Sequence, residues 1–102
     1  MTNCKSDVVS RTKILFELGQ VVATPGALAC LEKFGIGAIE LLRRHQSGDW
    51  GVLTAEDKTA NEQSVECNLR ILSNYPLQGE ERIWVITEAD RSVTTLLLPN
   101  EY

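Results

Sequence analysis

The sequence has few of the residues and motifs that mark a metal site, a redox site or a membrane span. Its 102 residues include one histidine and three cysteines. Cys4, Cys30 and Cys67 lie far apart and lack the paired spacing of a zinc or redox motif. No apolar run approaches the roughly 20 residues of a membrane span, and the first residues lack the apolar stretch of a signal peptide. We therefore expect a cytoplasmic protein without a metal, a cofactor or a membrane partner.

Known catalytic and nucleotide-binding signatures are also missing. The chain contains no phosphate-binding glycine loop, serine elbow, zinc finger or helix-turn-helix motif. Its net charge of -4 disfavours sequence-independent binding to a phosphate backbone, because the long-range field has the wrong sign. A nucleic acid would need a local basic patch, so this class of partner stays open.

The composition is that of one small globular domain. Hydrophobic residues make up 43% of the chain and charged residues 24%, which suits a single modest core. Residues 1–13 are polar and largely unpatterned. We therefore expect a flexible N-terminal arm, residues 1–13, followed by a single domain over residues 14–102.

Local signals predict three helices. Thr24 followed by Pro25 is typical of a helix start, and the helix is expected to run to about residue 34, where Gly35 ends it. A second helix is expected over residues 38–46. A capping threonine, Thr54, predicts the start of a third helix that continues to about Cys67.

Three strands are expected after the helices, over residues 69–75, 82–88 and 92–98. The middle one is apolar on both faces, which is typical of a central strand. We predict an α+β fold in which helices pack on a three- to four-stranded antiparallel meander, with residues 14–23 as the candidate fourth strand. The last strand has no following element to cover it, so we expect it to be an exposed edge that forms a two-fold homodimer.

The segment from Arg43 to Gly51, RRHQSGDWG, brings cations, an imidazole, a carboxylate, an indole and two glycines into one short stretch and is called the motif loop below. His45, flanked by arginines and followed by Asp49, has two open interpretations. It is either a general acid or base oriented by a carboxylate, or part of a cationic group at a helix C-terminus. Trp50 either packs over the loop or faces a cleft. A metal site is disfavoured because one histidine with scattered carboxylates lacks ligand spacing.

The third helix is expected to carry a polar stripe on its inward face. Asp57, Asn61 and Ser64 project within about 60° of one another, while Glu62 and Glu66 lie opposite. Inward polar groups need partners. The stripe is therefore either a buried hydrogen-bond network that orients the motif loop or the wall of a ligand site.

A second polar run, TEADRSVTT, surrounds a predicted turn near the C-terminus. Arg91 in this turn, with Arg70 and Arg82 on neighbouring strands, forms either an anion cradle or surface ion pairs with nearby carboxylates. Thr94 and Thr95 lie on opposite faces of a strand, so only one of them reaches the face that the helices leave open.

Several segments together carry a resemblance to one protein family. They are GQVVATPGAL, RHQSGDWG, the spaced Asp57 and Asn61, RILSNY and IWVITEADRSVTTLLLP with the closing EY. In this combination the sequence resembles small stand-alone proteins common on bacterial plasmids and other mobile elements. Some members carry the label of a type I restriction methylation subunit, although the chain has no methyltransferase glycine loop or catalytic tetrad. It has Asn68 where the family often has glycine.

The resemblance implies an origin on mobile DNA and a bacterial cytoplasm, and it supplies no catalytic residue. Two hypotheses for function follow. The first is a non-catalytic accessory module that binds a host protein or small ligand through Arg44, His45, Asp49, Trp50, Asp57, Asn61 and Arg91. The second is a small metal-independent enzyme, similar at the level of the fold to barnase-like and RelE-like ribonucleases, that uses His45, Arg91 and Thr94.

Overall fold

The structure is a computed structural model that describes residues 14–102, so the expected arm of residues 1–13 lies outside it. The described chain folds into three α-helices, a four-stranded sheet and a short 3-10 helix. This confirms the predicted α+β class. In chain order the elements are β2 (Gln20–Ala23), α1 (Pro25–Phe34), α2 (Ala38–Gln46), α3 (Ala55–Cys67), β3 (Ile71–Pro76), β4 (Arg82–Thr87), β5 (Val93–Leu97) and η2 (Pro99–Glu101).

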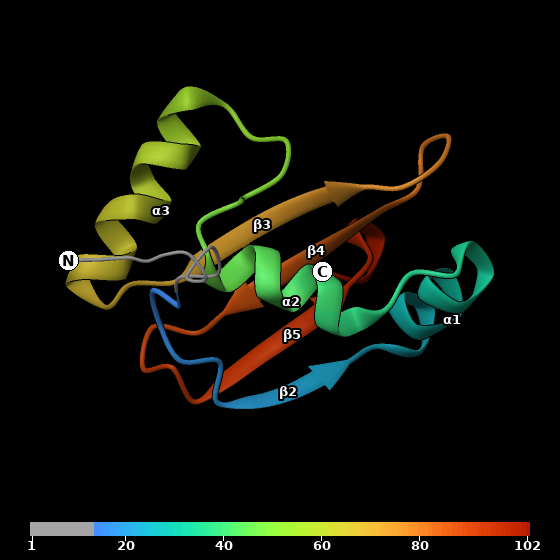
Figure 1. The fold of residues 1–102 in the computed structure, drawn as a ribbon, viewed down its shortest axis with the longest axis horizontal. Helices are drawn as coiled ribbons and strands as arrows, with labels where there is room; N and C mark the ends of the chain where they lie inside the picture. Colours follow the sequence, from blue (N-terminus) through green and yellow to red (C-terminus); the bar gives the residue numbers. More distant parts are fainter. Residues whose placement is uncertain (1–13) are drawn as a thin grey trace, which may run out of the picture.

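The sheet has the order β2-β5-β4-β3, and helices α1 and α2 pack on one of its faces (Figure 1). Strands β3, β4 and β5 form the predicted antiparallel meander, with β4 inside the sheet. The fourth strand, β2, pairs with β5 in parallel, so the sheet is mixed rather than purely antiparallel. Parallel pairing needs a crossover connection, and here three helices and two strands lie between the paired segments.

The prediction that the last strand is an exposed edge is wrong. Strand β5 lies between β2 and β4 and pairs with both. Residues 14–23 contribute only the four residues of β2, but these occupy the edge that we expected to be open. The reason given for a dimer through residues 92–98 therefore disappears.

The helix ends confirm the local capping signals. Thr24 Oγ1 accepts a hydrogen bond from Ala27 N at 3.1 Å, and Thr54 Oγ1 accepts one from Asp57 N at 3.1 Å. Asn68 ends α3 in the left-handed conformation with φ 55°, which asparagine tolerates better than most residues other than glycine. None of the helices in residues 14–102 is long and apolar enough to cross a membrane.

Two apolar clusters join the helices to the sheet. In the larger one, Leu31 of α1 and Leu41 of α2 pack with Ile83, Val85 and Leu96 from the two inner strands. Phe16, Ile71 of β3 and Trp50 of the motif loop form the smaller cluster. The motif loop is therefore anchored to the sheet through the Trp50 side chain.

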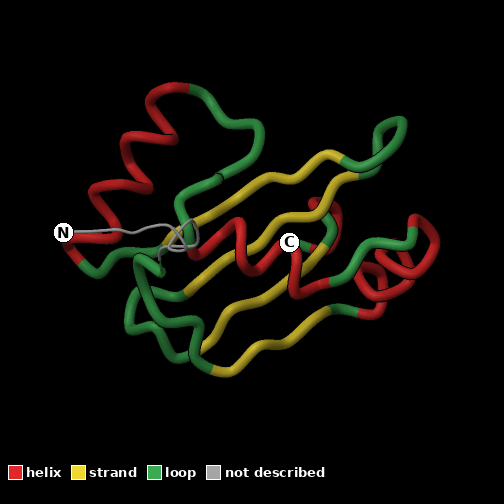
Figure 2. Tube along the Cα trace, in the orientation of Figure 1, coloured by secondary structure: helices red, strands yellow, loops and turns green. Residues whose placement is uncertain are grey.

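The outer edge of β3 is closed by side chains and by the loop that follows α2. Asn61 donates from Nδ2 to Leu72 O at 2.7 Å, and its Oδ1 accepts from Leu72 N at 3.2 Å. Asn74 N donates to Trp50 O at 2.9 Å, and Val52 N donates to Asn74 O at 2.8 Å. Figure 2 shows this loop running beside β3. Asn61 was expected to orient the motif loop, but its amide instead imitates one residue of a neighbouring strand.

We expect Asn61→Ala to lower the free energy of unfolding by about 1 to 3 kcal/mol, because it leaves the main chain of Leu72 without partners beneath α3. Chemical denaturation measures this change. The matched control is Glu62→Ala on the exposed face of the same helix, which should change stability by less than about 0.5 kcal/mol. Equal stability of the two variants would contradict the role assigned to Asn61.

Candidate functional site

The motif loop has one defined conformation because several contacts fix it at both ends. Arg44 Nε donates to Asp49 Oδ2 at 2.7 Å, and Asp49 Oδ1 accepts from Gly51 N at 3.3 Å. Gly51 has φ 78°, and a Cβ there would overlap the Asn74 carbonyl group. The main chain of the loop can therefore approach β3 only if this position is glycine.

Tyr75 attaches the loop to the sheet. Its hydroxyl donates to Asp49 O at 2.6 Å, and the Arg44 guanidinium lies over its ring at 4.5 Å. Burial raises the pKa of Tyr75 to about 12, so the phenol stays protonated and remains a donor. The hydrogen bond from Arg44 holds the pKa of the Asp49 carboxyl below its usual range and raises the pKa of the guanidinium. Arg44 and Asp49 thus neutralise each other at the loop surface.

The imidazole of His45 lies inside the protein, with an exposed fraction of 0%. The Phe16 ring meets it edge to face at 5.1 Å, and the Trp50 ring lies at 6.0 Å. Trp50 is itself buried. Neither side chain is on the surface where a binding face with Arg44 was expected.

A single chain of hydrogen bonds runs through His45 and has only one consistent direction. Thr94 Oγ1 must donate to Leu18 O at 2.7 Å, because a carbonyl oxygen only accepts. Thr94 therefore accepts from the Thr87 hydroxyl at 2.7 Å, and Thr87 accepts from His45 Nε2–H at 2.9 Å. The remaining nitrogen, Nδ1, accepts from the Ser73 hydroxyl at 2.6 Å. The chain therefore places a proton on Nε2, and Nδ1 is the acceptor in the neutral imidazole.

Burial, followed by the positive charge of Arg91, lowers the pKa of His45 from 6.5 to about 3. The imidazole is therefore neutral at pH 7, and both of its nitrogens are occupied. General acid-base catalysis needs a group that titrates near the working pH and reaches the substrate. His45 meets neither condition in this conformation.

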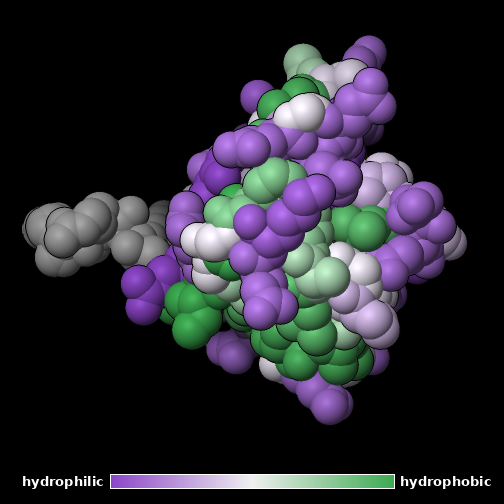
Figure 3. Space-filling view, turned by 90° about the vertical axis from the view of Figure 1, so that its right-hand side faces the viewer, coloured by the Kyte–Doolittle hydropathy of each residue, from purple (hydrophilic) through white to green (hydrophobic). Residues whose placement is uncertain are grey.

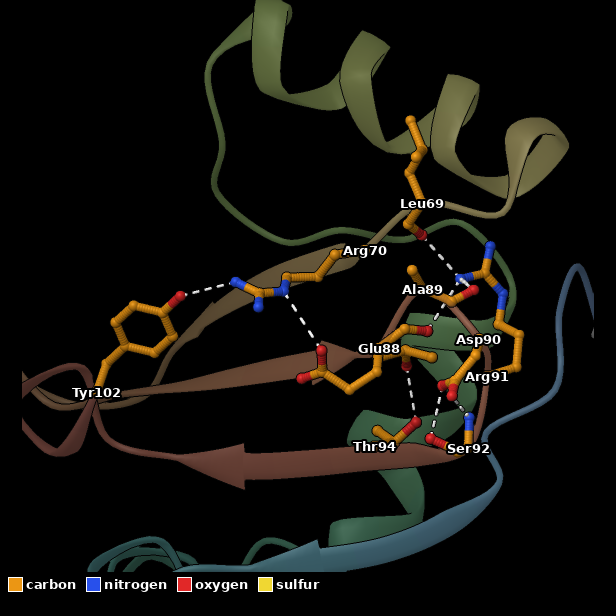
Figure 4. A network of polar contacts seen from close by, with 10 residues as sticks. Leu69, Arg70, Glu88, Ala89, Asp90, Arg91, Ser92, Thr94 and Tyr102 are labelled. Carbon is orange, nitrogen blue, oxygen red and sulfur yellow. Dashed lines mark hydrogen bonds and ion pairs between the residues drawn. The ribbon is translucent and has the colours of Figure 1, made fainter.

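Arg91 acts as a clamp between the β4–β5 turn and the end of α3. In the left-handed conformation at φ 61°, it donates to Ser64 O and Leu69 O, each at 2.7 Å. It also donates to the carbonyl oxygens of Glu88 and Ala89 at 3.2 Å. Figure 4 shows the guanidinium turned towards Leu69. These carbonyl groups take up the donors of Nη1 and one donor of Nη2, so most of the guanidinium already serves to join the turn to α3.

The neighbouring arginine, Arg70, also has local partners. Its Nε lies 3.6 Å from Glu88 Oε1, and its Nη1 donates to the Tyr102 hydroxyl at 2.8 Å. Arg70 and Arg91 turn away from each other in Figure 4. Arg70 therefore forms a surface ion pair with Glu88, one of the two predicted alternatives. Arg70 and Arg91 do not together form a site for an anion.

The predicted residues of α3 lie at a groove between this helix and the face of the sheet opposite α1 and α2. We call this the α3 groove. Its main hollow has a volume of about 530 Å³, and a smaller hollow of about 220 Å³ adjoins it at Leu53, Asp57 and Leu72. Exposed Asp57 lines both hollows, and Asn61 lines the smaller one. The main hollow is lined by Val52, Leu53, Thr54, Asp57, Leu72, Asn74 and Trp84.

Two buried polar atoms of residues lining this groove have no hydrogen-bond partner among the described residues. They are the indole nitrogen of Trp84 and Oδ1 of Asn74, which occupy opposed positions on β4 and β3. Asn74 donates from Nδ2 to Val52 O at 3.0 Å, which fixes the orientation of its amide and leaves Oδ1 as the unpaired atom. Two residues that line the groove thus each hold a buried polar atom without a partner, one a donor and the other an acceptor.

The structure divides the predicted site residues among three places. His45, Arg91 and Thr94 come together, but around the internal hydrogen-bond chain rather than a cleft. Arg44 and Asp49 lie on the motif loop, whereas Asp57 and Asn61 lie at the α3 groove. Within residues 14–102, no three histidine, cysteine, aspartate or glutamate side chains are grouped to hold a metal ion.

Sequence reasoning missed four residues that define these places, namely Ser73, Asn74, Trp84 and Thr87. A signal existed for two of them. Thr87 continues the inward positions of Ile83 and Val85, and Ser73 is an inward residue of β3. A hydroxyl at an inward position of an apolar strand needs a buried partner, and the single histidine was the available one.

We expect the imidazole signals of His45 to show no titration between about pH 8 and 5, and the ¹⁵N shifts to identify protonated Nε2 and unprotonated Nδ1. Assignment is unambiguous because the chain has one histidine. Thr87→Val removes the acceptor for Nε2–H and should change the balance between the two neutral forms. A midpoint near 6.5 in the parent would contradict the buried arrangement.

Protein stability should also depend on His45. The unfolded chain takes up a proton on this residue below about pH 6.5, whereas the folded protein does so only near pH 3. The contribution of neutral His45 to the free energy of unfolding is therefore fully present above about pH 6.5. On acidification the free energy of unfolding falls by up to about 1.4 kcal/mol per pH unit. Denaturation between about pH 6 and 4.5 should show this slope in the parent and a much smaller one in His45→Gln. Equal slopes would refute the assignment.

Comparisons of this chain with protein-family models, with curated proteins and with solved structures give no match. The resemblance to small plasmid proteins therefore stays a prediction. The function must be inferred from the contacts and surfaces of the chain itself.

Proposed function

We propose that this protein is a non-catalytic interaction module that binds an extended segment of a partner protein in the α3 groove. The resemblance to proteins of mobile DNA supports a bacterial plasmid or related element as its setting, with a host protein in the cytoplasm as the partner. The observation that carries the proposal is the unpaired donor and acceptor, Trp84 Nε1 and Asn74 Oδ1.

The chemistry of the groove suits a peptide. A binding hollow is typically apolar with a few fixed polar groups, and here Val52, Leu53 and Leu72 line the hollow together with Asn74 and Trp84. A peptide unit presents a carbonyl oxygen and an N–H group, which match the indole donor and the amide acceptor. Buried polar atoms without partners are costly, so a ligand gains that energy if the Trp84 and Asn74 side chains turn towards the groove and pair with it.

The lining favours the α3 groove over a neighbouring hollow, because Trp84 lines both hollows but Asn74 lines only the groove. A second hollow of about 500 Å³ lies on the other side of Trp84, between the β3–β4 turn and η2, and acidic Glu80 and Glu81 contribute to its lining. The α3 groove instead combines exposed apolar surface with both unpaired atoms. Val52 is 61% exposed there, although it is fixed by its main-chain bond to β3.

The ribonuclease-like alternative gains no support from the geometry. His45 and Thr94 are fully buried, and Arg91 donates to four carbonyl oxygens. A phosphodiester would have to displace the Phe16 and Trp50 rings that pack against His45 to reach its imidazole. A binding role uses the surface as it stands.

We expect peptides selected from a random displayed library to bind the parent protein and to require the α3 groove. Val52→Asp should weaken their binding at least about tenfold, because it places a charge against apolar contacts. Ile39→Asp is the matched control, since Ile39 is 63% exposed on α2, away from the groove. Binding to the control should match the parent within about twofold.

The two tryptophans supply an internal comparison. The indole N–H signal of Trp84 should shift on peptide binding, whereas that of Trp50, enclosed with Phe16 and His45, should stay in place. Selected peptides that bind Val52→Asp as well as the parent, or that leave the Trp84 signal unchanged, would refute the proposed groove.

A further inference from the structure

The two edges of the sheet differ in whether their outward main-chain groups have hydrogen-bond partners. At β3, the Asn61 amide occupies the outward main-chain groups of Leu72, and Trp50 and Val52 occupy those of Asn74. At the opposite edge, β2 has a partner on one side only, namely β5. Figure 1 shows β2 at the margin of the sheet farthest from α3. The protein blocks one edge and leaves the other open among the described residues.

The hydrogen-bond pattern identifies which groups of β2 are free. Gln20 N donates to Ser92 O at 2.9 Å, and Thr24 N donates to Leu96 O at 3.0 Å. In a parallel pair alternate residues bond to the same neighbour, so Val22 also turns its main chain towards β5. The N–H and carbonyl groups of Val21 and Ala23 therefore point to the open edge.

This edge lacks the usual protection against pairing. Natural edge strands carry charges, proline or bulges, but the four residues of β2 are Gln-Val-Val-Ala. Val21 and Val22 are 41% and 39% exposed, and nearby Leu28 at the start of α1 is 54% exposed. Figure 3 shows hydrophobic residues gathered low on this side of the molecule, at the height where Figure 1 places β2.

We propose that β2 pairs antiparallel with β2 of a second copy, so that two sheets become one continuous sheet with Val22 on the two-fold axis. In this register Val21 of one copy lies opposite Ala23 of the other, and each such pair exchanges two main-chain hydrogen bonds. Val22 meets its own counterpart, and Gln20 faces Thr24.

The occupant is a second copy because the two-fold register brings the exposed apolar side chains of two uncharged segments together. The residues with free main-chain groups, Val21 and Ala23, are symmetric about Val22. The paired segment from Gln20 to Thr24 contains no charge, so the two-fold axis brings no like charges together. The surface is independent of the α3 groove, which lies at the other edge of the sheet.

The proposed β2–β2 contact is small, so we expect weak association of the two copies. Stable interfaces bury about 1,600 Å² in total, and two four-residue strands with their flanking side chains provide less. We therefore expect a dimer that dissociates at micromolar concentrations, with a dissociation constant of about 10 to 100 μM.

Sedimentation equilibrium of the full chain from about 5 to 500 μM should show a reversible monomer–dimer equilibrium. Val22→Lys places two charges on the axis and should weaken association at least about tenfold, whereas Ile39→Lys, an equally large change at another exposed site, should not. A parent that stays monomeric throughout, or a Val22→Lys variant that dimerises like the parent, would overturn the proposal.

Disulfide trapping tests the register and does not depend on the folding of Val22→Lys. In a chain with Cys4→Ser and Cys67→Ser, Val22→Cys should crosslink under mild oxidation, because opposed Cβ atoms at such a pair lie about 4.5 to 5.5 Å apart. Gln20→Cys is the control, since its counterpart lies about 13 Å away along the strands. Crosslinking of Gln20→Cys as efficient as that of Val22→Cys would overturn the register.

Discussion

The buried hydrogen-bond chain through His45 is the interaction on which the arrangement of this domain depends. It starts on β3, passes through α2, crosses β4 and β5, and ends at the carbonyl group of Leu18 ahead of β2. Each hydroxyl has one proton, so every member needs the next one in place. The chain thereby fixes α2 on the sheet and fixes how β2 joins it.

Local structure could be predicted from the sequence because local residues determine it. Thr24, Gly35 and Thr54 mark the helix ends where the structure has them, and the apolar residues on both faces of β4 correctly indicated a central strand. The parallel pairing of β2 with β5 could not be predicted in this way. This pairing joins segments separated by most of the chain, and the residues of neither segment indicate which strand it pairs with.

The candidate site illustrates a different limit. A polar run such as RHQSGDWG has the composition of a functional site, yet a buried polar network has the same composition. Sequence alone cannot distinguish them, since the difference lies in whether the atoms face solvent or one another. For His45 they face one another, whereas Asp57 remains exposed beside an open groove.

The late position of β5 in the chain has a consequence for the order of folding. Helix α1 and the β3–β4 hairpin are built from contacts close in sequence, so they can form early. Strand β2 finds its neighbour only when β5 exists, because no other described strand pairs with it. During synthesis β2 is therefore made early but cannot pair until β5 has been made. Until then both edges of β2 lack a described partner strand.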